Sequence, residues 1–206
     1  MVNWAIASNH LDFRTVGTGY GFQMAEIIEE LRACVSEGLR IDQRVEIFQK
    51  AKNSSEILYI HDNVGEIAFD KLLIRELRRY GRSVTSVLRG GPITSDATME
   101  DGEVVGLQEA ASEIILAGPD TLGISLNEMS DQLKREFQTT DLVIAKGQAN
   151  YYALTEYRSK VPGEITLGHL RKRSYDHISL KPLFCKAFSH LKIVLLAFFY
   201  LIFSIF

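Results

Sequence analysis

Cysteine and proline are scarce in this chain of 206 residues, which contains two Cys and four Pro. Cys34 and Cys185 are far apart in the sequence, and neither belongs to a CxxC or Cys/His group. The sequence therefore predicts neither a disulfide framework nor a zinc site, and we expect a reducing, cytoplasmic environment. Few Pro and only 15 Gly also exclude collagen-like and low-complexity chains.

Positive charge is not in excess, because 23 Lys and Arg face 26 Asp and Glu, for a formal net charge of −3. Nucleic-acid binding requires a basic face that displaces counterions, so we expect no nucleic-acid partner. The average conceals a division, since residues 158–206 carry eight Lys and Arg against two Asp and Glu. We therefore predict one domain over residues 1–157 and a basic, hydrophobic tail over residues 158–206.

No apolar run reaches the length of a membrane span. The longest, residues 193–203, continues to Phe206, whereas a spanning helix needs about 20 residues, so a membrane partner is not expected. A tail anchor, a buried terminal element and an out-of-frame extension remain three alternatives for this segment. Because the run is apolar on every side, without a period of 2 or 3.6, we expect the chain from about Val161 to pack poorly. Its removal should then improve solubility without loss of metal binding.

Helical and strand patterns alternate along residues 1–157. Apolar residues at helical spacing predict helices over residues 22–39, 68–80, 103–111 and 127–137. Short apolar runs predict strands over residues 56–60, 83–88, 114–117 and 141–145. Strands separated by helices form a mostly parallel sheet covered on both faces, so the expected fold class is α/β with three layers, α/β/α.

Polar segments follow three of the predicted strands, and in parallel sheets ligands bind beyond the carboxyl ends of the strands. The segments are residues 62–66 (Asp-Asn-Val-Gly-Glu), 94–98 (Thr-Ser-Asp-Ala-Thr) and 146–150 (Lys-Gly-Gln-Ala-Asn). Asp62, Asn63 and Asp96 offer the carboxylate and amide oxygens that Mg²⁺ or Mn²⁺ prefers. Lys146 beside Gly147 offers a point charge and backbone N–H groups, which suit phosphate.

Each segment also has an interpretation without function. Asp62 and Asn63 are preferred residues at a helix N-cap, and Lys146 with Gly147 also suits an exposed turn. All three segments at the ends of successive strands favour metal-assisted phosphoryl chemistry. His61 receives no role, because a lone His beside a strand end is more often a hydrogen-bonded structural residue.

The polar segments resemble those of the damage-control phosphatases, formerly the domain-of-unknown-function 89 proteins, and in particular their stand-alone archaeal and bacterial branch. Residues 62–66 resemble the family's DNAGE segment, residues 94–98 its second metal-binding aspartate and residues 146–150 its KGQGN. Residues 7–13 (Ala-Ser-Asn-His-Leu-Asp-Phe) are similar to its AGNxxDF. The resemblance covers about residues 4–157.

The resemblance implies a metal-dependent phosphatase, a hydrolase of small phosphorylated metabolites such as sugar phosphates or damaged phosphorylated cofactor intermediates. It implies Asp62, Asn63 and Asp96 as ligands of a divalent ion, Mg²⁺, Mn²⁺, Co²⁺ or Ni²⁺. Such an ion neutralises a phosphate oxygen and activates a water for attack on phosphorus. Asp62 and Lys146 are then the expected catalytic residues, with Lys146 near the substrate phosphate.

Substrate contacts are expected from a wider set of polar residues at the same edge: Asn9, Asp12, Glu66, Lys146, Gly147 and Asn150. For Asn9 and Asp12, a polar strand end or turn is an equally good interpretation. Thr98 is expected to cap the helix that follows it.

Departures from the family pattern keep a second function class open. Ser8 and Ala149 each stand where the family has glycine, and a methyl group at Ala149 matters only if the backbone needs positive φ or approaches a ligand closely. Members of the branch usually begin with a further helical region, which we expect to be absent here, and the sequence after Tyr157 looks divergent. A catalytically inactive remnant that binds metal or a partner is therefore the alternative to an enzyme.

A nucleotide- or cofactor-binding α/β domain, such as a methyltransferase, is a third alternative. Residues 17–21 (Gly-Thr-Gly-Tyr-Gly) are too closely spaced for a GxGxxG and follow no clear strand, so the sequence disfavours it.

Overall fold

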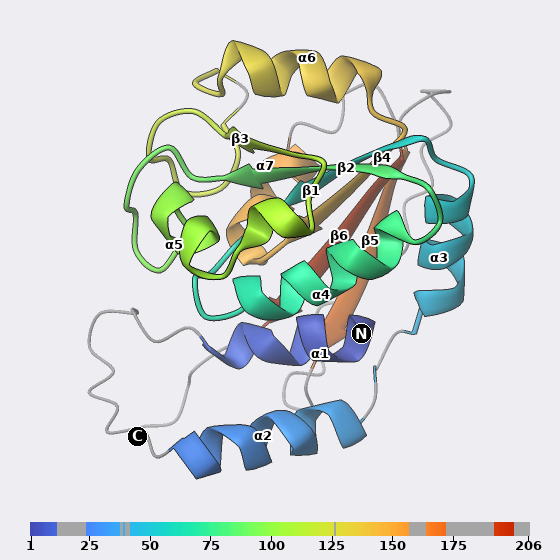
Figure 1. The fold of residues 1–206 in the computed structure, drawn as a ribbon, viewed down its shortest axis with the longest axis vertical. Helices are drawn as coiled ribbons and strands as arrows, with labels where there is room; N and C mark the ends of the chain where they lie inside the picture. The colour runs from blue at the N-terminus through green and yellow to red at the C-terminus, as the bar shows by residue number, and fades with distance from the viewer. Residues whose placement is uncertain are drawn as a thin grey trace.

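In the described part of the chain, six strands, all paired in parallel, form a central sheet (Figure 1). The structure is a computed structural model that describes residues 1–11, 24–37, 39, 42–125, 127–156, 164–171 and 192–199. The strand order is β3-β2-β1-β4-β6-β5. The strands are β1 Glu56–Ile60, β2 Ser83–Leu88, β3 Glu113–Leu116, β4 Leu142–Lys146, β5 Glu164–Arg171 and β6 Lys192–Phe199. The predicted α/β class is confirmed.

Helices connect the strands and cover both faces of the sheet. They are α1 Val2–Ala7, α2 Met24–Ser36, α3 Arg44–Lys52, α4 Ile67–Arg78, α5 Met99–Val104, α6 Asp131–Thr139 and α7 Gln148–Glu156, with short 3-10 helices η1 Ser8–Leu11 and η2 Leu107–Glu109. In Figure 1, α6 lies on one side of the sheet, and α1 and α4 lie on the other.

Alternate residues of β1 contribute to two separate cores. Ile57 and Tyr59 belong to the core that includes residues of α1, α3 and α4. Leu58 and Ile60 belong to the core that includes residues of α6 and α7. All four side chains are at most 1% exposed, and burying a side chain of this size contributes about 1.5–3 kcal/mol. This burial on both faces of the sheet gives the three layers.

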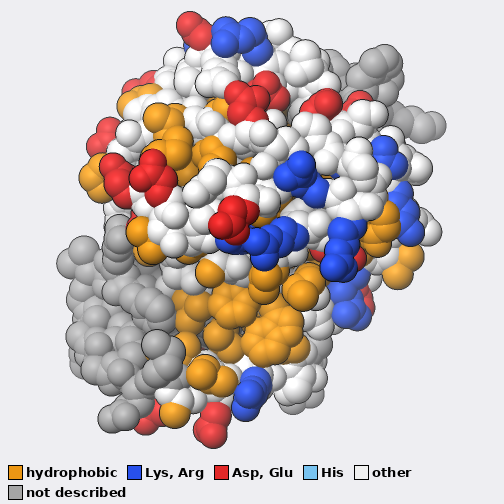
Figure 2. Space-filling view, in the orientation of Figure 1, with side chains coloured by type: hydrophobic (Ala, Val, Ile, Leu, Met, Phe, Trp, Pro, Cys, Tyr) orange, Lys and Arg blue, Asp and Glu red, His pale blue; other side chains and the backbone are white. Residues whose placement is uncertain are grey.

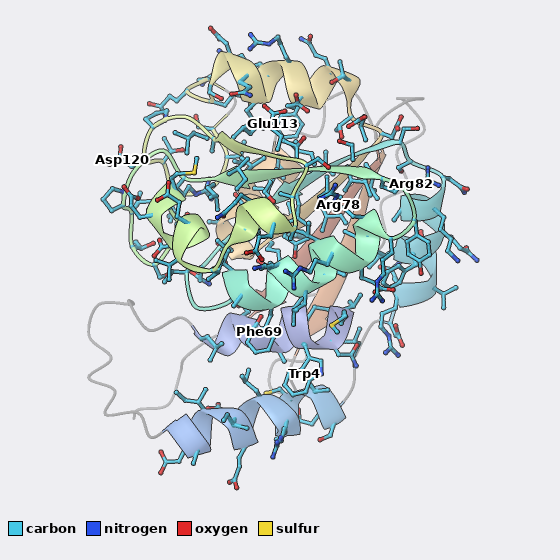
Figure 3. The ribbon with its side chains drawn as sticks, viewed as in Figure 1. Trp4, Phe69, Arg78, Arg82, Glu113 and Asp120 are labelled. Atoms are coloured by element: carbon cyan, nitrogen blue, oxygen red, sulfur yellow. The ribbon has the colours of Figure 1, made fainter. Side chains whose placement is uncertain are left out.

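The amino-terminal helices form an outer layer beside α4. Leu31 of α2 is buried with Ala7 and Leu11. Trp4 of α1 stacks on Phe69 of α4 with ring centroids 6.0 Å apart (Figure 3). Hydrophobic side chains gather in the part of the surface view where Figure 1 draws α1 (Figure 2).

One predicted helix is wrong in its position. Residues 103–111 were expected to be helical, but α5 begins at Met99 and Gly106, with a φ of 66°, separates it from η2. The early start follows from a capping box, in which the Asp101 carboxylate accepts a hydrogen bond of 2.9 Å from the Thr98 N–H. The capping role predicted for Thr98 is therefore confirmed.

The tail also differs from its expectation, because two of its segments are strands of the sheet. β6 pairs with β4, from Leu142 opposite Lys192 to Lys146 opposite Leu196, and β5 pairs with β6. A strand inside a parallel sheet is covered on both faces, so its sequence is a continuous apolar run rather than an alternating one. The expectation that a buried strand must show a period of 2 was the source of the error. The domain boundary near residue 157 stays a prediction.

Among the described residues, no helix has both the length and the hydropathy that crossing a membrane requires.

Candidate functional site

The ends of β1 and β2 bring Asp62, Asn63 and Asp96 together. After β2 the chain turns back, and Asp96 forms an isolated antiparallel bridge with Asn63. Next to this bridge, the Ala97 N–H donates to the Asp62 carbonyl at 2.7 Å. The three side chains that were predicted to share an edge of the sheet are therefore neighbours, and all three residues are buried.

Asn9 and Glu66 surround the Asp62–Asn63 pair. The Glu66 carboxylate oxygen Oε1 accepts a hydrogen bond of 3.0 Å from the Asn63 N–H and another of 3.0 Å from Asn9 Nδ2. Asn63 Nδ2 donates to Asp62 Oδ2 at 3.1 Å. Glu66 occupies the N-cap position of α4, so the interpretation of Asp62 and Asn63 as the helix cap is wrong.

Burial and neighbouring carboxylates disfavour ionisation of the acidic side chains in this group. Burial raises the pKa of the Asp62 carboxyl well above its ordinary value, and the charges of Glu66 and Asp96 raise it further. Burial also raises the pKa of Glu66, against the lowering effect of Lys146. The ionised forms of Asp62 and Glu66 are therefore disfavoured in this arrangement, and a bound cation would favour them.

Lys146 is 1% exposed at the end of β4, so the interpretation of this residue as part of an exposed turn is wrong. Its ammonium donates to the Ala5 carbonyl at 2.5 Å, to Asp70 Oδ1 at 2.9 Å and to Glu66 Oε2. Burial alone would lower the pKa of Lys146, but Asp70 and Glu66 raise it above its ordinary value. An ammonium group has three N–H donors, so the predicted contact with a phosphate requires exchange of one of these acceptors.

Asp70 links Lys146 to a second set of buried polar groups. Its carboxylate accepts from the Tyr59 hydroxyl at 2.9 Å and lies 3.0 Å from His61 Nδ1. Burial opposes ionisation of Asp70, but the charge of Lys146 and the contact with His61 outweigh it and lower the pKa. His61 is thus a hydrogen-bonded structural residue, as expected.

No role was predicted for Asp70, although its position in the sequence is informative. It lies four residues after Glu66 on α4, between Ile67 and Ile74, which are buried in the core. Residues three or four apart share a helix face, so Asp70 is a charged residue within an apolar stripe.

Arg89 is another residue for which no role was predicted. It follows β2 directly and is 3% exposed. Its guanidinium forms an ion pair with Asp96 through Nε and donates to Asn150 Oδ1 at 2.8 Å through Nη2. Asn150 in turn donates from Nδ2 to the carbonyls of His61, at 3.1 Å, and Lys146, at 2.8 Å.

Gly147 and Ala149 have different backbone requirements. Gly147 has a φ of 85° and lies against the Asp62 carboxylate. Ala149 lies within α7 and does not have a positive φ; among the described non-glycine residues, positive φ occurs at Thr94. The backbone at position 149 therefore does not require glycine. The replacement in KGQAN is therefore compatible with the backbone. Asp12, also predicted as a substrate contact, lies outside the described residues.

A sequence model of the damage-control phosphatase ARMT1-like domain matches residues 1–192. The chain belongs to this family. The match continues beyond Tyr157, where the resemblance had been expected to end.

Archaeal relatives of this family are similar to the chain over about half of their own length. An uncharacterised protein of Methanocaldococcus jannaschii is 40% identical over 158 residues, which are 76% of this chain and 50% of the relative. A damage-control phosphatase of Archaeoglobus fulgidus is 38% identical over 142 residues, 66% of this chain and 49% of the relative. One from Pyrococcus horikoshii is 36% identical over 156 residues, 75% of this chain and 52% of the relative.

The fold is similar to the crystal structure of a DUF89 family protein from Pyrococcus horikoshii. The TM-score is 0.68 at 36% identity, and the match covers 75% of this chain and 53% of that chain.

The donor chemistry of this family member fits a hard divalent cation. Over the described ranges, no group of three or more His, Cys, Asp or Glu is arranged to hold a metal ion. The cluster instead combines two carboxylates, Asp62 and Asp96, with the amide of Asn63. Asn63 Oδ1 accepts a hydrogen bond of 2.7 Å from Ser95 Oγ, and an amide oxygen has a second lone pair for a cation. Carboxylate and amide oxygen donors suit Mg²⁺ or Mn²⁺ rather than a softer metal.

Proposed function

We propose that the chain is a metal-dependent phosphatase, a phosphomonoester hydrolase that acts on small phosphorylated metabolites. The observation that carries the proposal is the meeting of Asp62, Asn63 and Asp96 at the carboxyl ends of β1 and β2. Two relatives named damage-control phosphatases support the reaction class. Sugar phosphates and damaged phosphorylated cofactor intermediates are the proposed substrates, and a cytoplasmic location without a nucleic-acid partner is proposed with them.

The residues of the site have different proposed roles. Asp62, Asn63 and Asp96 would hold the cation, which supplies charge neutralisation for the phosphate group and lowers the pKa of water. Glu66 braces the Asp62–Asn63 turn by accepting from the Asn63 N–H. Lys146 compensates the charge of Glu66 and Asp70 and is the proposed cation for the substrate phosphate after exchange of one acceptor.

Substrate contacts are proposed for residues around this centre. Asn9 Nδ2 lies 3.4 Å from Asp62 Oδ2, which places an amide donor beside the proposed cation ligands. Gly147, between β4 and α7, lies with its backbone against Asp62, and Asn150 in the first turn of α7 is proposed beside it. Asp12 belongs to the same proposal on the resemblance alone.

Hydrolysis of para-nitrophenyl phosphate by the full chain tests the proposal. We expect Mn²⁺ to stimulate release of phosphate and excess EDTA to abolish it. Asp62→Asn keeps the shape of the side chain but removes its charge, so it should abolish the stimulated rate. The matched control is Asp131→Asn on α6, where the side chain is 84% exposed, and this variant should behave as the wild type.

Two results would contradict the proposal in different ways. Hydrolysis that persists in excess EDTA would remove the metal from the reaction. Binding of Mn²⁺ without hydrolysis of any phosphate ester would instead support an inactive, metal-binding member of the family.

A further inference from the structure

Arg89 is the first residue after β2, and its backbone is bonded to the far end of the loop that follows. Its backbone N–H donates to the Ala97 carbonyl at 3.0 Å, and the Ala97 N–H donates to the Asp62 carbonyl at 2.7 Å. Residues on both sides of the loop are therefore fixed to the end of β1. The Arg89 side chain starts from a rigid position and remains inside the protein, with 3% of its surface exposed.

The guanidinium joins two segments that are distant in the sequence. Nε faces Asp96, which belongs to the loop after β2, and Nη2 faces Asn150, which belongs to α7. Asn150 is fully buried, and its amide nitrogen already donates to the carbonyls of His61 and Lys146. These two donations leave the Asn150 oxygen turned toward Arg89, so the orientation of the guanidinium is fixed from the β1 and β4 ends.

Charge explains why an arginine lies here. Asp96 is buried, and a buried carboxylate needs a partner or a cation. Lys146 is already bonded to Glu66 and Asp70, while Arg89 is the ion-pair partner of Asp96. A guanidinium is planar and presents its donors in a fixed fork, so it sets the rotation of the carboxylate as well as its charge.

We propose that Arg89 is a positioning residue of the cation site. It holds Asp96, which is bridged to Asn63, in one rotation: Oδ2 faces the guanidinium and Oδ1 lies 3.5 Å from the Thr94 hydroxyl. Its contact with Asn150 couples this rotation to the KGQAN segment. The inference rests on the proposed function, because it assigns Asp96 to the cation.

Binding of Mn²⁺ by the full chain, measured by titration calorimetry well below the unfolding temperature, tests the positioning role. Arg89→Lys retains the positive charge but cannot reach Asp96 and Asn150 through a planar fork. We expect its Mn²⁺ affinity to fall about 10- to 100-fold, the range found when the partner of a metal ligand is removed. Arg79→Lys at the C-cap of α4, where the side chain is 76% exposed, is the matched control and should retain the wild-type affinity.

A second variant acts on the coupling without changing any charge. Asn150→Ala removes the acceptor of Arg89 and leaves the ion pair with Asp96 in place. We expect its Mn²⁺ affinity to fall several-fold. Because both variants act on one coupled arrangement, the double variant should lose less than the product of the two separate effects. A residue that only stabilises the fold would lower the unfolding temperature and leave the Mn²⁺ affinity unchanged.

The outcomes separate this inference from the proposed function. Wild-type Mn²⁺ affinity in both Arg89→Lys and Asn150→Ala would overturn the positioning role, while hydrolysis by the wild type would still support the phosphatase. Mn²⁺ binding without hydrolysis would contradict the phosphatase, and the affinity ratios would still decide the role of Arg89. If Arg89→Lys does not fold, Asn150→Ala decides it alone. A wild-type chain that binds no Mn²⁺ would overturn both proposals.

Discussion

Gly147 and Asp62 approach so closely that a side chain on Gly147 would occupy the space of the Asp62 carboxylate. A Cβ atom built at Gly147 would lie 2.0 Å from Asp62 Cγ, and the φ of Gly147 is 85°. Glycine is required at this position both for space and for the backbone conformation. The lack of space beside Asp62 is what connects Gly147, between β4 and α7, with the proposed cation site.

Gly147→Ala should therefore weaken Mn²⁺ binding as well as stability. The backbone contribution can be isolated with Gly81→Ala, because Gly81 has a φ of 74° and no atom within 4 Å of a built Cβ. We expect Gly81→Ala to lose about 1–2 kcal/mol of unfolding free energy and to retain the wild-type Mn²⁺ affinity. Gly147→Ala should lose more, because the methyl group displaces Asp62. Urea unfolding measures the stability of each variant, and titration calorimetry measures its Mn²⁺ affinity. Equal losses in Gly147→Ala and Gly81→Ala would contradict a contact between the added methyl group and Asp62.

Lys146 is predicted to be the largest single electrostatic contributor to stability among the described residues. Lys146→Met leaves Glu66 and Asp70 buried without their shared cation, and breaking such a buried pair costs about 3–5 kcal/mol. The loss should shrink as the pH falls, because protonation removes the unpaired charge. Lys134→Met is the control, because Lys134 and its partner Asp131 are 45% and 84% exposed, and it should cost less than about 1 kcal/mol. Urea unfolding measures the free energy of unfolding of both variants. Similar losses in the two would contradict a larger contribution from the buried ion pairs of Lys146.

The polar edge was predictable because strands and their ends are marked locally. β1 and β2 were predicted with the bounds that the structure gives, and the segments after them contain Asp62, Asn63 and Asp96. In a parallel sheet these ends must face the same edge, so their proximity needs no long-range information. The local pattern was therefore sufficient for this part of the site.

The environment of Lys146 could not be predicted in the same way. Its acceptors are a backbone carbonyl of Ala5 and the carboxylates of Glu66 and Asp70, which are at least 76 positions away. Nothing in the segment Lys-Gly-Gln-Ala-Asn distinguishes an outward ammonium from a buried one. The same limit applies to Arg89, whose contact with Asn150 joins residues 61 positions apart.

Glu136 on α6 is predicted to be mildly unfavourable in the folded protein near neutral pH. Partial burial, together with the charges of Glu113 and Glu56, raises the pKa of Glu136 above its ordinary value. A raised pKa in an acid means that the folded state disfavours the ionised form, so stability is lost as the pH rises through that pKa. Glu136→Gln should therefore gain a few tenths of a kcal/mol near pH 7, and the gain should vanish below about pH 4, where both states are protonated. Glu29→Gln, exposed on α2, is the control for urea unfolding at the two pH values, and a gain that persists in acid would contradict the assignment.

Deletion of the tail is predicted to destabilise the body, the opposite of what its sequence pattern suggested. β6 pairs with β4 along the whole of Leu142–Lys146, so deleting residues 158–206 leaves that edge of β4 without a partner. All five residues of β4 are buried, and an unpaired apolar edge promotes association between chains. Each lost backbone hydrogen bond contributes about 1 kcal/mol, so the total loss should reach several kcal/mol.

Urea unfolding and light scattering of the chain 1–157 measure this effect. The control is a chain that ends at residue 199, which retains both β5 and β6. We expect the control to unfold at the denaturant concentration of the full chain, and the chain 1–157 to unfold at a lower concentration and to associate. Since β4 ends at Lys146, loosening of its edge should also weaken Mn²⁺ binding through Gly147 and Asn150. A monomeric chain 1–157 with full stability and full Mn²⁺ affinity would instead establish residue 157 as a true domain boundary, because β4 would then need no neighbour on that side.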